Sequence, residues 1–315
     1  MQTFHPSPLT VMAVVVLDLL LKDPHYRLHP VRLVGEIISF GEDICRKVPF
    51  PSRIQGVLLT AGVELVTVFS VLLFILLSSL LHLQWLASLF LGYSALAGGA
   101  LWEEIERVGE AASRGELQSA RKLLSFLVTR DTSNMDQSEV LRTAIESLAE
   151  NTADGIVAPL LFFAIGGAPL AFFYKAADTL DSMVGYLTPR YAQFGWAAAR
   201  LDDLLNFIPA RITALLVAVA GWPLGLSPKV TLETIKRFSR SSLSPNSGYP
   251  EAAFAGALGV QLGGGRCVYF DQPVDLPPIG EGRRAVTPRD LQLAVNLSKA
   301  TTFAALLLSL LIAAF

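Results

Sequence analysis

The sequence has too few charged residues for an ordinary soluble domain. Charged side chains make up 17% of its 315 residues, whereas about 25% is typical of soluble domains. Hydrophobic residues make up 52% of the chain, and the mean hydropathy is +0.49. The formal net charge is only -2, and there is no basic tail or aromatic-basic patch of the kind that binds nucleic acid. We therefore predict an all-α protein that crosses the lipid bilayer several times and has no nucleic-acid partner.

Cysteine is also scarce. Cys45 and Cys267 lie far apart and lack the spacing of metal ligands, so no disulfide framework follows. We interpret them as free thiols in a reducing compartment or as small buried apolar residues. The Gly-x-Ser-x-Gly, His-Glu-x-x-His, Cys-x-x-Cys and Walker A motifs are all missing, which leaves several common enzyme classes without support.

Six apolar segments follow one another along the chain. They are 9–21, 57–81, 85–101, 156–174, 204–226 and 300–315. About 20 apolar residues suffice to cross a bilayer. The first segment contains Asp18 and lacks both a basic n-region and an Ala-x-Ala cleavage site, so we do not interpret it as a cleavable signal. We expect four to six membrane helices, some of them broken by Pro and Gly.

The polar loops between these segments indicate an orientation. Loops 22–55, 102–155 and 227–299 hold six, six and nine Lys or Arg, but 177–206 holds only two. If all six segments span, the basic loops share one side, which the positive-inside rule makes cytoplasmic. The four aspartates of 177–206 would then face outward, unless the broken segments dip into the membrane and line a cavity.

We expect a multi-pass protein of the cell (inner) membrane, with its active site open to the cytoplasm. A single integral-membrane domain would cover 1–315, with a motif-bearing core at about 130–265.

One group of polar residues lies at the end of a predicted helix. A capping box at 136–139 starts this helix, on which Glu146 and Glu150 point the same way. Together with Asn151 and Asp154 they place three carboxylates and an amide within nine residues. Oxygen ligands of this kind suit Mg²⁺ or water-mediated contacts to a nucleotide. A solvated helix face explains the spacing equally well.

A second group consists of aspartates in apolar surroundings. Asp178 and Asp181 are one helical turn apart, and Asp202 and Asp203 lie on a second predicted helix. Two aspartate-bearing helices can hold metal-bound phosphates, and unpaired carboxylates between apolar flanks would be costly. Their position favours a functional role. The alternative is a structural ion network with Lys175, Arg200 and Arg211.

Two weaker signals remain. The turn Ser244–Gly248 precedes a run of small residues that would let backbone N–H groups approach an anion, but no strand and no Gly-Lys-Ser/Thr accompany it. Close helix packing explains the small residues equally well. His29 could act as a general base or a phosphate ligand, although a lone loop histidine more often does neither.

Several of these stretches together resemble the CobD/CbiB family of membrane proteins of cobalamin (vitamin B12) biosynthesis. The matching stretches, in chain order, are LDLLLKDPHYRLHPVRLVGEII, RDTS, AIESLAENTADGIVAPLLFFAIGGAPLAFFYKA, TLDSMVGY, RYAQFGWAAARLDDLLNFIPARITAL and SPNSGYPEAAFAGALGVQLGG. The resemblance covers most of the chain. It implies a ligase that consumes ATP and Mg²⁺ to join adenosylcobyric acid, a corrinoid, to (R)-1-aminopropan-2-ol O-phosphate, giving adenosylcobinamide phosphate. Other corrinoid-pathway enzymes would be possible partners.

The resemblance supports the positions, and chemistry suggests the roles. A carboxylate does not react with an amine until it is phosphorylated, so such a ligase needs metal-bound ATP, anion donors and room for a corrinoid. As catalytic residues we expect Glu146, Glu150, Asp181 and Lys175. As groups that bind ATP or phosphate we expect Arg130, Asn151, Asp154, Arg200, Ser244 and Asn246. As Mg²⁺ ligands we expect Asp178, Asp181, Asp202 and Asp203.

The chain departs from the family pattern at Asp178, where members usually have Asn, and at 240–243. The main alternative is a non-catalytic membrane sensor similar to the AmpE proteins, which would not need so many carboxylates in apolar surroundings. A transporter would fit the broken helices, but no inverted repeat is visible. Lipid-phosphate transfer at an aspartate-bound metal is a further alternative.

Overall fold

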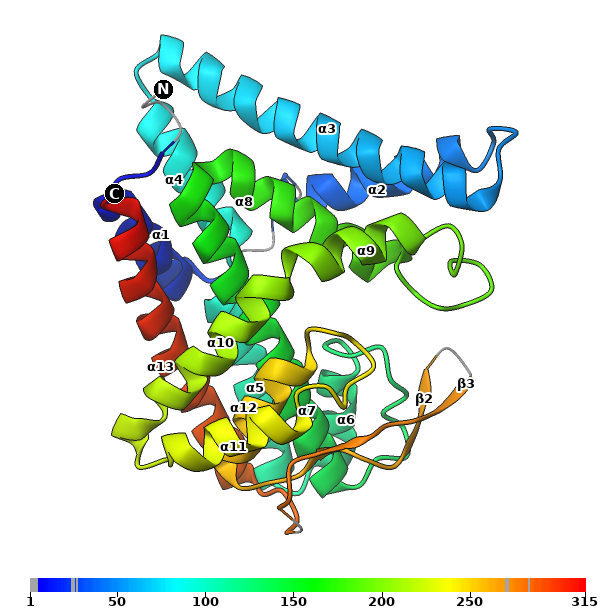
Figure 1. The fold of residues 1–315 in the computed structure, drawn as a ribbon, viewed down its shortest axis with the longest axis vertical. Coiled ribbons are helices and arrows are strands. Elements are labelled where there is room, and N and C mark those ends of the chain that lie inside the picture. Colours follow the sequence, from blue (N-terminus) through cyan, green and yellow to red (C-terminus); the bar gives the residue numbers. More distant parts are fainter. Residues whose placement is uncertain (1–4, 24–25, 27, 270–271, 283) are drawn as a thin grey trace. The chain divides into compact units, whose positions relative to one another are not determined.

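A computed structural model describes residues 5–315 except 24–25, 27, 270–271 and 283, and most of what it describes is helical (Figure 1). Within this part of the chain, five helical segments are long and apolar enough to cross a membrane. They are Ser52–Leu80, Gln84–Ser113, Gln137–Val184, Phe207–Leu224 and Pro288–Ala313. The apolar helix Pro8–Leu21 is shorter. The predicted all-α membrane fold and the expected number of spans are confirmed.

The described chain divides into two compact units that are interleaved in sequence. The first comprises Met1–Ala97, Ala158–Asn206 and Leu306–Phe315, and the second comprises Gly98–Val157 and Phe207–Ala305. Both contain candidate membrane spans, so the single-domain expectation stays a prediction.

The first unit is built around α3. Its helices are α1 (Pro8–Leu21), α2 (Pro30–Cys45), α3 (Ser52–Leu80), α4 (Gln84–Ala95), α8 (Ala158–Val184) and α9 (Trp196–Leu205). Helix α3 packs along α2, α8 and α9, and α1 packs against α4 (Figure 1). One face of α3 buries residues such as Leu59 and Val63, while Leu65, Phe69 and Leu80 are more than 60% exposed. Exposed apolar residues on a span-length helix are typical of a lipid-facing surface.

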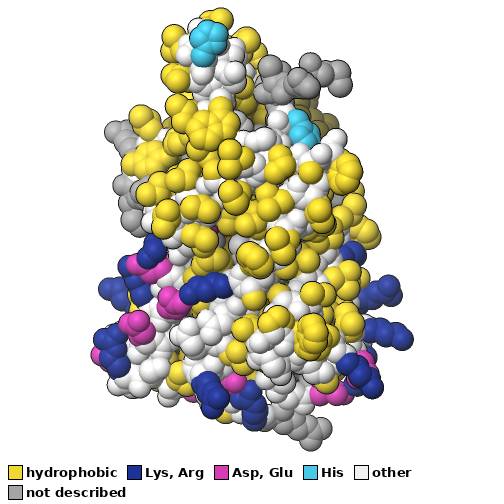
Figure 2. Space-filling view, turned by 90° about the vertical axis from the view of Figure 1, so that its left-hand side faces the viewer, with side chains coloured by type: hydrophobic (Ala, Val, Ile, Leu, Met, Phe, Trp, Pro, Cys, Tyr) yellow, Lys and Arg dark blue, Asp and Glu magenta, His cyan; other side chains and the backbone are white. Residues whose placement is uncertain are grey.

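Figure 2 shows one face of the surface, on which hydrophobic side chains form a broad continuous area and charged side chains gather elsewhere. Monomeric soluble proteins rarely expose apolar patches of this kind. The surface therefore agrees with the membrane assignment.

Helix α8 is kinked near its middle. Gly166 and Gly167 leave the helical conformation, and Gly167 has φ +65°, a value that favours glycine. Pro169 follows and cannot donate a helical hydrogen bond. The predicted Pro/Gly break of this segment is confirmed.

The connection between α8 and α9 is held against α2. Glu42 on α2 accepts hydrogen bonds from Arg46 (2.6 Å) and Arg190 (3.1 Å), and the Arg46 guanidinium lies 4.0 Å from the centre of the Phe194 ring. Burial opposes ionisation of Glu42, but the two arginines prevail and lower its pKa. This ion network fixes the connection that follows Asp178 and Asp181.

The second unit buries the apolar faces of its helices in one core. Its helical elements are α5 (Gly98–Ser113), α6 (Leu117–Leu124), α7 (Gln137–Asn151), the π-helix η1 (Thr152–Val157), α10 (Phe207–Ala220), the 3-10 helix η2 (Trp222–Leu224), α11 (Pro228–Phe238), α12 (Gly248–Leu258) and most of α13 (Pro288–Ala313). Fully buried Ile105, Leu148 and Phe254 contribute to the core. The predicted capping box is present: the Asp136 side chain accepts the Glu139 N–H, and the Glu139 side chain accepts the Asp136 N–H. Helices α5 and α6 are separated at Gly115, which has φ +76°.

Short strands lie within the polar loop 227–299. Strand β2 (Arg266–Tyr269) pairs with β3 (Gln272–Asp275), and β1 (Leu262–Gly263) pairs with β4 (Pro278–Ile279), both antiparallel. These strands are two to four residues long, too short to show a clear alternating pattern in the sequence.

Candidate functional site

In the second unit, Glu146 is the centre of a buried charged group. Its side chain forms an ion pair with Arg130, and its Oε1 accepts the backbone N–H of Gly263 at 2.6 Å. The Glu146 side chain is 4% exposed and that of Arg130 is 15% exposed. A solvated helix face is therefore wrong for Glu146. The structure brings together two predicted site residues, one on α7 and one in the loop before it.

The remaining members of the first predicted group follow Glu146 along the chain. Glu150 is exposed at the end of α7, and the Asn151 side chain donates back to the Ser147 carbonyl at 2.9 Å. Asp154 lies within the π-helix, a rare geometry that often marks functional sites. The Asn151 amide is thus used within its own helix in this structure.

Glu251 in the first turn of α12 was not identified from the sequence. The groups that act on its carboxyl are Glu150 and Glu146 of α7, Arg130, and Ser247 one turn earlier, with which it hydrogen-bonds. Burial raises the pKa of Glu251 well above its usual range, and the charges of Glu150 and Glu146 raise it further. A carboxyl of this kind holds its proton at pH values where ordinary carboxyls are ionised. No local motif shows it, because its neighbours come from α7 and the loop before α7.

The turn Ser244–Gly248 lies before α12 and is ordered by its own side chains. The Ser244 Oγ accepts the N–H groups of Asn246 (3.2 Å) and Ser247 (3.3 Å). The Asn246 Oδ1 accepts a hydrogen bond from Arg211 at 3.2 Å. Both predicted phosphate ligands of this turn therefore have partners within the second unit.

Two arginines lie beside this turn, and neither was assigned to it from the sequence. The Arg211 guanidinium lies 3.6 Å from the centre of the Phe207 ring and 4.1 Å from that of Tyr249. Burial opposes ionisation of Tyr249, but a hydrogen bond from Arg240 and the charge of Arg211 lower its pKa. Two cations near one turn favour an anionic ligand.

In the first unit, three aspartates influence one another. Asp178 and Asp181 lie on α8, and Asp202 lies on α9, which packs against α8. Burial raises the pKa of Asp202 to about 8, and the nearby charges of Asp178 and Asp181 contribute to the rise. The predicted meeting of two aspartate-bearing helices is thus present in the structure.

Specific partners position these aspartates. Lys175 donates to Asp178 at 2.7 Å, Asn206 donates to Asp202 at 2.9 Å, and Tyr174 donates to the Asn206 Oδ1 at 2.9 Å. Gly185 packs against Asp181, whose Oδ1 would lie 1.8 Å from a Cβ at this position. The Lys175–Asp178 pair is part of the ion network that we considered as an alternative.

Asp203 and Arg200 pair with each other. The Arg200 Nη1 lies 3.2 Å from the Asp203 Oδ2, and the Arg200 side chain is 66% exposed. Arg211 contacts Asn246 instead of an aspartate. Within the described part of the chain, no three His, Cys, Asp or Glu side chains form a group that could hold a metal ion. The assignment of Mg²⁺ to the four aspartates stays a prediction.

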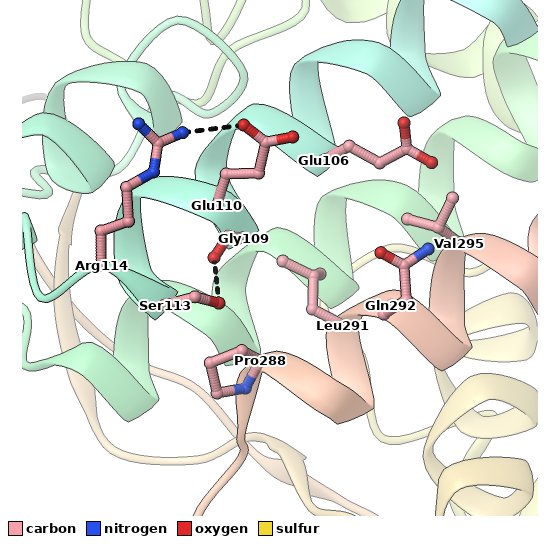
Figure 3. Close-up of a pocket in the computed structure, with 9 residues that line it drawn as sticks. All are labelled: Glu106, Gly109, Glu110, Ser113, Arg114, Pro288, Leu291, Gln292 and Val295. Atoms are coloured by element: carbon pink, nitrogen blue, oxygen red, sulfur yellow. Dashed lines mark hydrogen bonds and ion pairs between the residues drawn. The ribbon is translucent and has the colours of Figure 1, made fainter.

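Two further features lie outside these groups. A cavity of about 480 Å³ in the second unit is lined by α5 and α13 residues that include Glu106, Glu110 and Gln292, and it contains none of the predicted site residues (Figure 3). In the first unit, His29 is buried 3.3 Å from Asp23. Burial lowers the pKa of His29, although the Asp23 charge opposes this shift, so the ring is neutral near pH 7.

The fold and these polar groups define an all-α membrane protein with one set of interacting carboxyls and cations in each unit. Residues 11–298 match the family model described as CobD/Cbib protein. The chain belongs to this family.

Similar chains named "Cobalamin biosynthesis protein CobD" occur in several bacteria. The chain is 49% identical to that of Geobacter metallireducens over 273 residues, which cover 86% of each chain. It is 40% identical to that of Pelobacter propionicus over 313 residues, covering 98% of this chain and 96% of the relative. The Clostridium perfringens protein is 38% identical over 300 residues, covering 94% and 95%. The comparison with solved structures finds no match.

Proposed function

We propose that the protein is an ATP-dependent amide ligase of cobalamin biosynthesis. It would join adenosylcobyric acid to (R)-1-aminopropan-2-ol O-phosphate and release adenosylcobinamide phosphate. The observation that carries this proposal is the presence in each unit of several carboxyls beside a cation: Glu146, Glu150 and Glu251 with Arg130, and Asp178, Asp181 and Asp202 with Lys175. Membership of the CobD/CbiB family and the names of the relatives support it.

The donor chemistry of the first unit fits Mg²⁺. Asp178, Asp181 and Asp202 offer oxygen ligands, and their mutual repulsion would be relieved by a cation. A closed cage is not required, because Mg²⁺ is usually bound by one or two carboxylates together with substrate phosphates. Lys175 lies beside these carboxylates and would neutralise a phosphate oxygen.

ATP supplies the phosphoryl group that converts the unreactive corrinoid carboxylate into an acylating agent. Arg130 would then steady the developing charge, and Glu146 orients Arg130 through its ion pair. Arg211, Arg240 and the Ser244–Gly248 turn would hold the phosphate of the amino-alcohol substrate. We place both substrates on the cytoplasmic side of the cell membrane, where ATP and other corrinoid-pathway enzymes are available.

The test is an assay of detergent-purified protein with ATP, Mg²⁺, adenosylcobyric acid and the amino-alcohol phosphate, read by mass spectrometry. We expect the amide product together with ADP. Omission of any one substrate should abolish the product. Absence of product with all substrates and well-folded protein would overturn the proposal.

Two variants test whether Glu150 and Asp181 are needed for the ligase activity. Glu150→Gln and Asp181→Asn should each lose activity while keeping the wild-type melting temperature. A fully active variant would remove that residue from the scheme.

A further inference from the structure

Glu251 belongs to the charged group of the second unit but has no role in the scheme so far. It lies in the first turn of α12, which packs against α7, the helix of Glu146 and Glu150, and against β1, whose Gly263 binds Glu146. The charges that act on its carboxyl are those of Glu150, Glu146 and Arg130. Glu146 is already occupied by Arg130 and the Gly263 N–H. The Glu251 carboxyl hydrogen-bonds to Ser247, and a carboxyl has acceptor sites on both oxygens, so it can also bind a ligand.

The charges around Glu251 favour a cationic ligand. Three carboxyls face one guanidinium in this group. Arg211 from α10 and Arg240 from the segment after α11 contact α12 at Tyr249. Arg284 donates to the Leu258 carbonyl at the opposite end of the helix. The primary amine of an amino-alcohol phosphate is protonated near neutral pH, as a lysine amine is. Its ammonium group is therefore attracted to the Glu251 side, and its phosphate to the two arginines at Tyr249.

We propose that Glu251 is the general base that takes a proton from the substrate ammonium group in amide formation. This inference rests on the proposed ligase function. The Glu251 carboxylate accepts one N–H proton, and the freed lone pair of nitrogen attacks the phosphorylated carboxyl carbon. The C–N bond forms, the C–O bond to phosphate breaks, and phosphate leaves with the bonding pair and takes the second nitrogen proton.

The environment of Glu251 suits this role. A base works best when its pKa is close to the working pH, and the raised pKa of Glu251 moves it in that direction. The ionised fraction of Glu251 increases as the pH rises, so amide formation should increase with pH over a range above that of an ordinary carboxyl.

The test separates the two halves of the reaction. Hydroxylamine is largely unprotonated near neutral pH and traps an activated carboxyl as a hydroxamate without needing a base. We expect Glu251→Gln to form hydroxamate at the wild-type rate but to form the amide about 10²–10⁴-fold more slowly, the usual contribution of a general base. Glu251→Asp should recover part of the amide rate. In Glu251→Gln the amide rate should instead rise in proportion to the free-amine fraction of the substrate, so its acidic limb should move to the higher pH range of an ordinary amine.

Glu233 on α11 provides the matched control, because it is exposed in the same unit and Glu233→Gln should change neither product. If Glu251→Gln forms the amide within tenfold of wild type, or loses hydroxamate and amide equally, Glu251 is not the base. If the wild-type protein forms neither product, the ligase function itself fails and the role of Glu251 fails with it.

Discussion

At the scale of single residues, the distinctive feature of this protein is buried charge held in pairs. Arg130 and Glu146 are both largely buried and form an ion pair with each other. Such a pair gains little over an apolar core, but loss of one partner leaves an uncompensated charge and is costly. The stability of the second unit should therefore depend on keeping both members or removing both.

Arg130→Met tests this dependence. It leaves the Glu146 carboxylate buried without its cation, which costs about 3–5 kcal/mol. We expect an apparent melting temperature in detergent lower by on the order of 10 °C. Glu146→Gln added to Arg130→Met removes the charge but keeps an acceptor for the Gly263 N–H, so part of the loss should return.

Arg142 is the control, because its Nη2 lies 3.9 Å from exposed Glu139 and Arg142→Met should change the melting temperature little. A double variant no more stable than Arg130→Met would contradict this interpretation of the pair.

The Glu42 network predicts a dependence on pH. The lowered pKa of Glu42 means that its stabilisation is present above its ordinary value of 4.5 and is lost as the pH falls through the lower folded value. Glu42→Gln should lower the melting temperature by about 3–6 °C at pH 7, from the loss of charged hydrogen bonds. The gap from wild type should narrow as the pH falls below 4.5 and should close once the pH is below the lowered pKa of folded Glu42.

Melting curves between pH 3.5 and 8 check this, with Glu36→Gln, an exposed position on the same helix, as the control. A gap that is the same at every pH would show that the Glu42 charge does not contribute.

At the scale of elements, glycine sets the closest approach between segments of the first unit. A Cβ at Gly56 on α3 would lie 1.7 Å from the carbonyl oxygen of Phe194. That oxygen belongs to the backbone and cannot move aside as a flexible side chain can. The α8–α9 connection thus packs directly against α3, in addition to its ion pairs with α2.

Gly56→Ala should force α3 away from residue 194 and destabilise the protein by about 1–3 kcal/mol, the usual cost of overpacking. Gly62 is the matched control on the same helix, because nothing lies within 4 Å of a Cβ there. Gly62→Ala should be neutral or stabilising by about 0.5–1 kcal/mol. Thermal melts of the two variants decide the point, and equal stability would mean that the close contact is not present in the protein.

The sequence predicted those elements that depend on local spacing. The capping box of Asp136 and Glu139 and the Pro/Gly break of the 156–174 segment depend only on neighbouring residues, and both are present. The carboxylate positions were identified from their spacing and apolar surroundings, and the family resemblance supported them. Glu251 and the Glu146–Gly263 hydrogen bond could not be predicted, because they join residues about a hundred positions apart. Such contacts depend on how α7, α12 and the strands pack, which no spacing within one segment encodes.

At the scale of the whole molecule, two routes through the membrane can be compared for the chain near α8. A single straight crossing would put the α8–α9 connection and its neighbouring aspartates on the outer side, away from cytoplasmic ATP. The kink at Gly166 and Gly167 offers another route. The half of α8 after the kink, 168–184, is about 25 Å long at 1.5 Å per residue. A helix broken at this depth can enter the membrane and return to the side from which it came, provided that protein or water satisfies the freed backbone groups.

Cysteine labelling distinguishes the two routes. In a background with Cys45→Ala and Cys267→Ala, single cysteines would be introduced by His82→Cys, Ser113→Cys and Leu187→Cys, all at exposed positions. The His82→Cys variant, with its cysteine between α3 and α4, should react with a membrane-impermeant maleimide in spheroplasts. The Ser113→Cys variant, with its cysteine at the end of α5, should react only in inverted vesicles. We expect Leu187→Cys to be labelled only in inverted vesicles, as Ser113→Cys is. The reason is that Asp178 and Asp181 can serve an ATP-dependent ligase only if their side of the membrane is cytoplasmic. Labelling of Leu187 in spheroplasts would instead put these aspartates outside, and the Mg²⁺ and ATP roles proposed for the first unit would have to be abandoned.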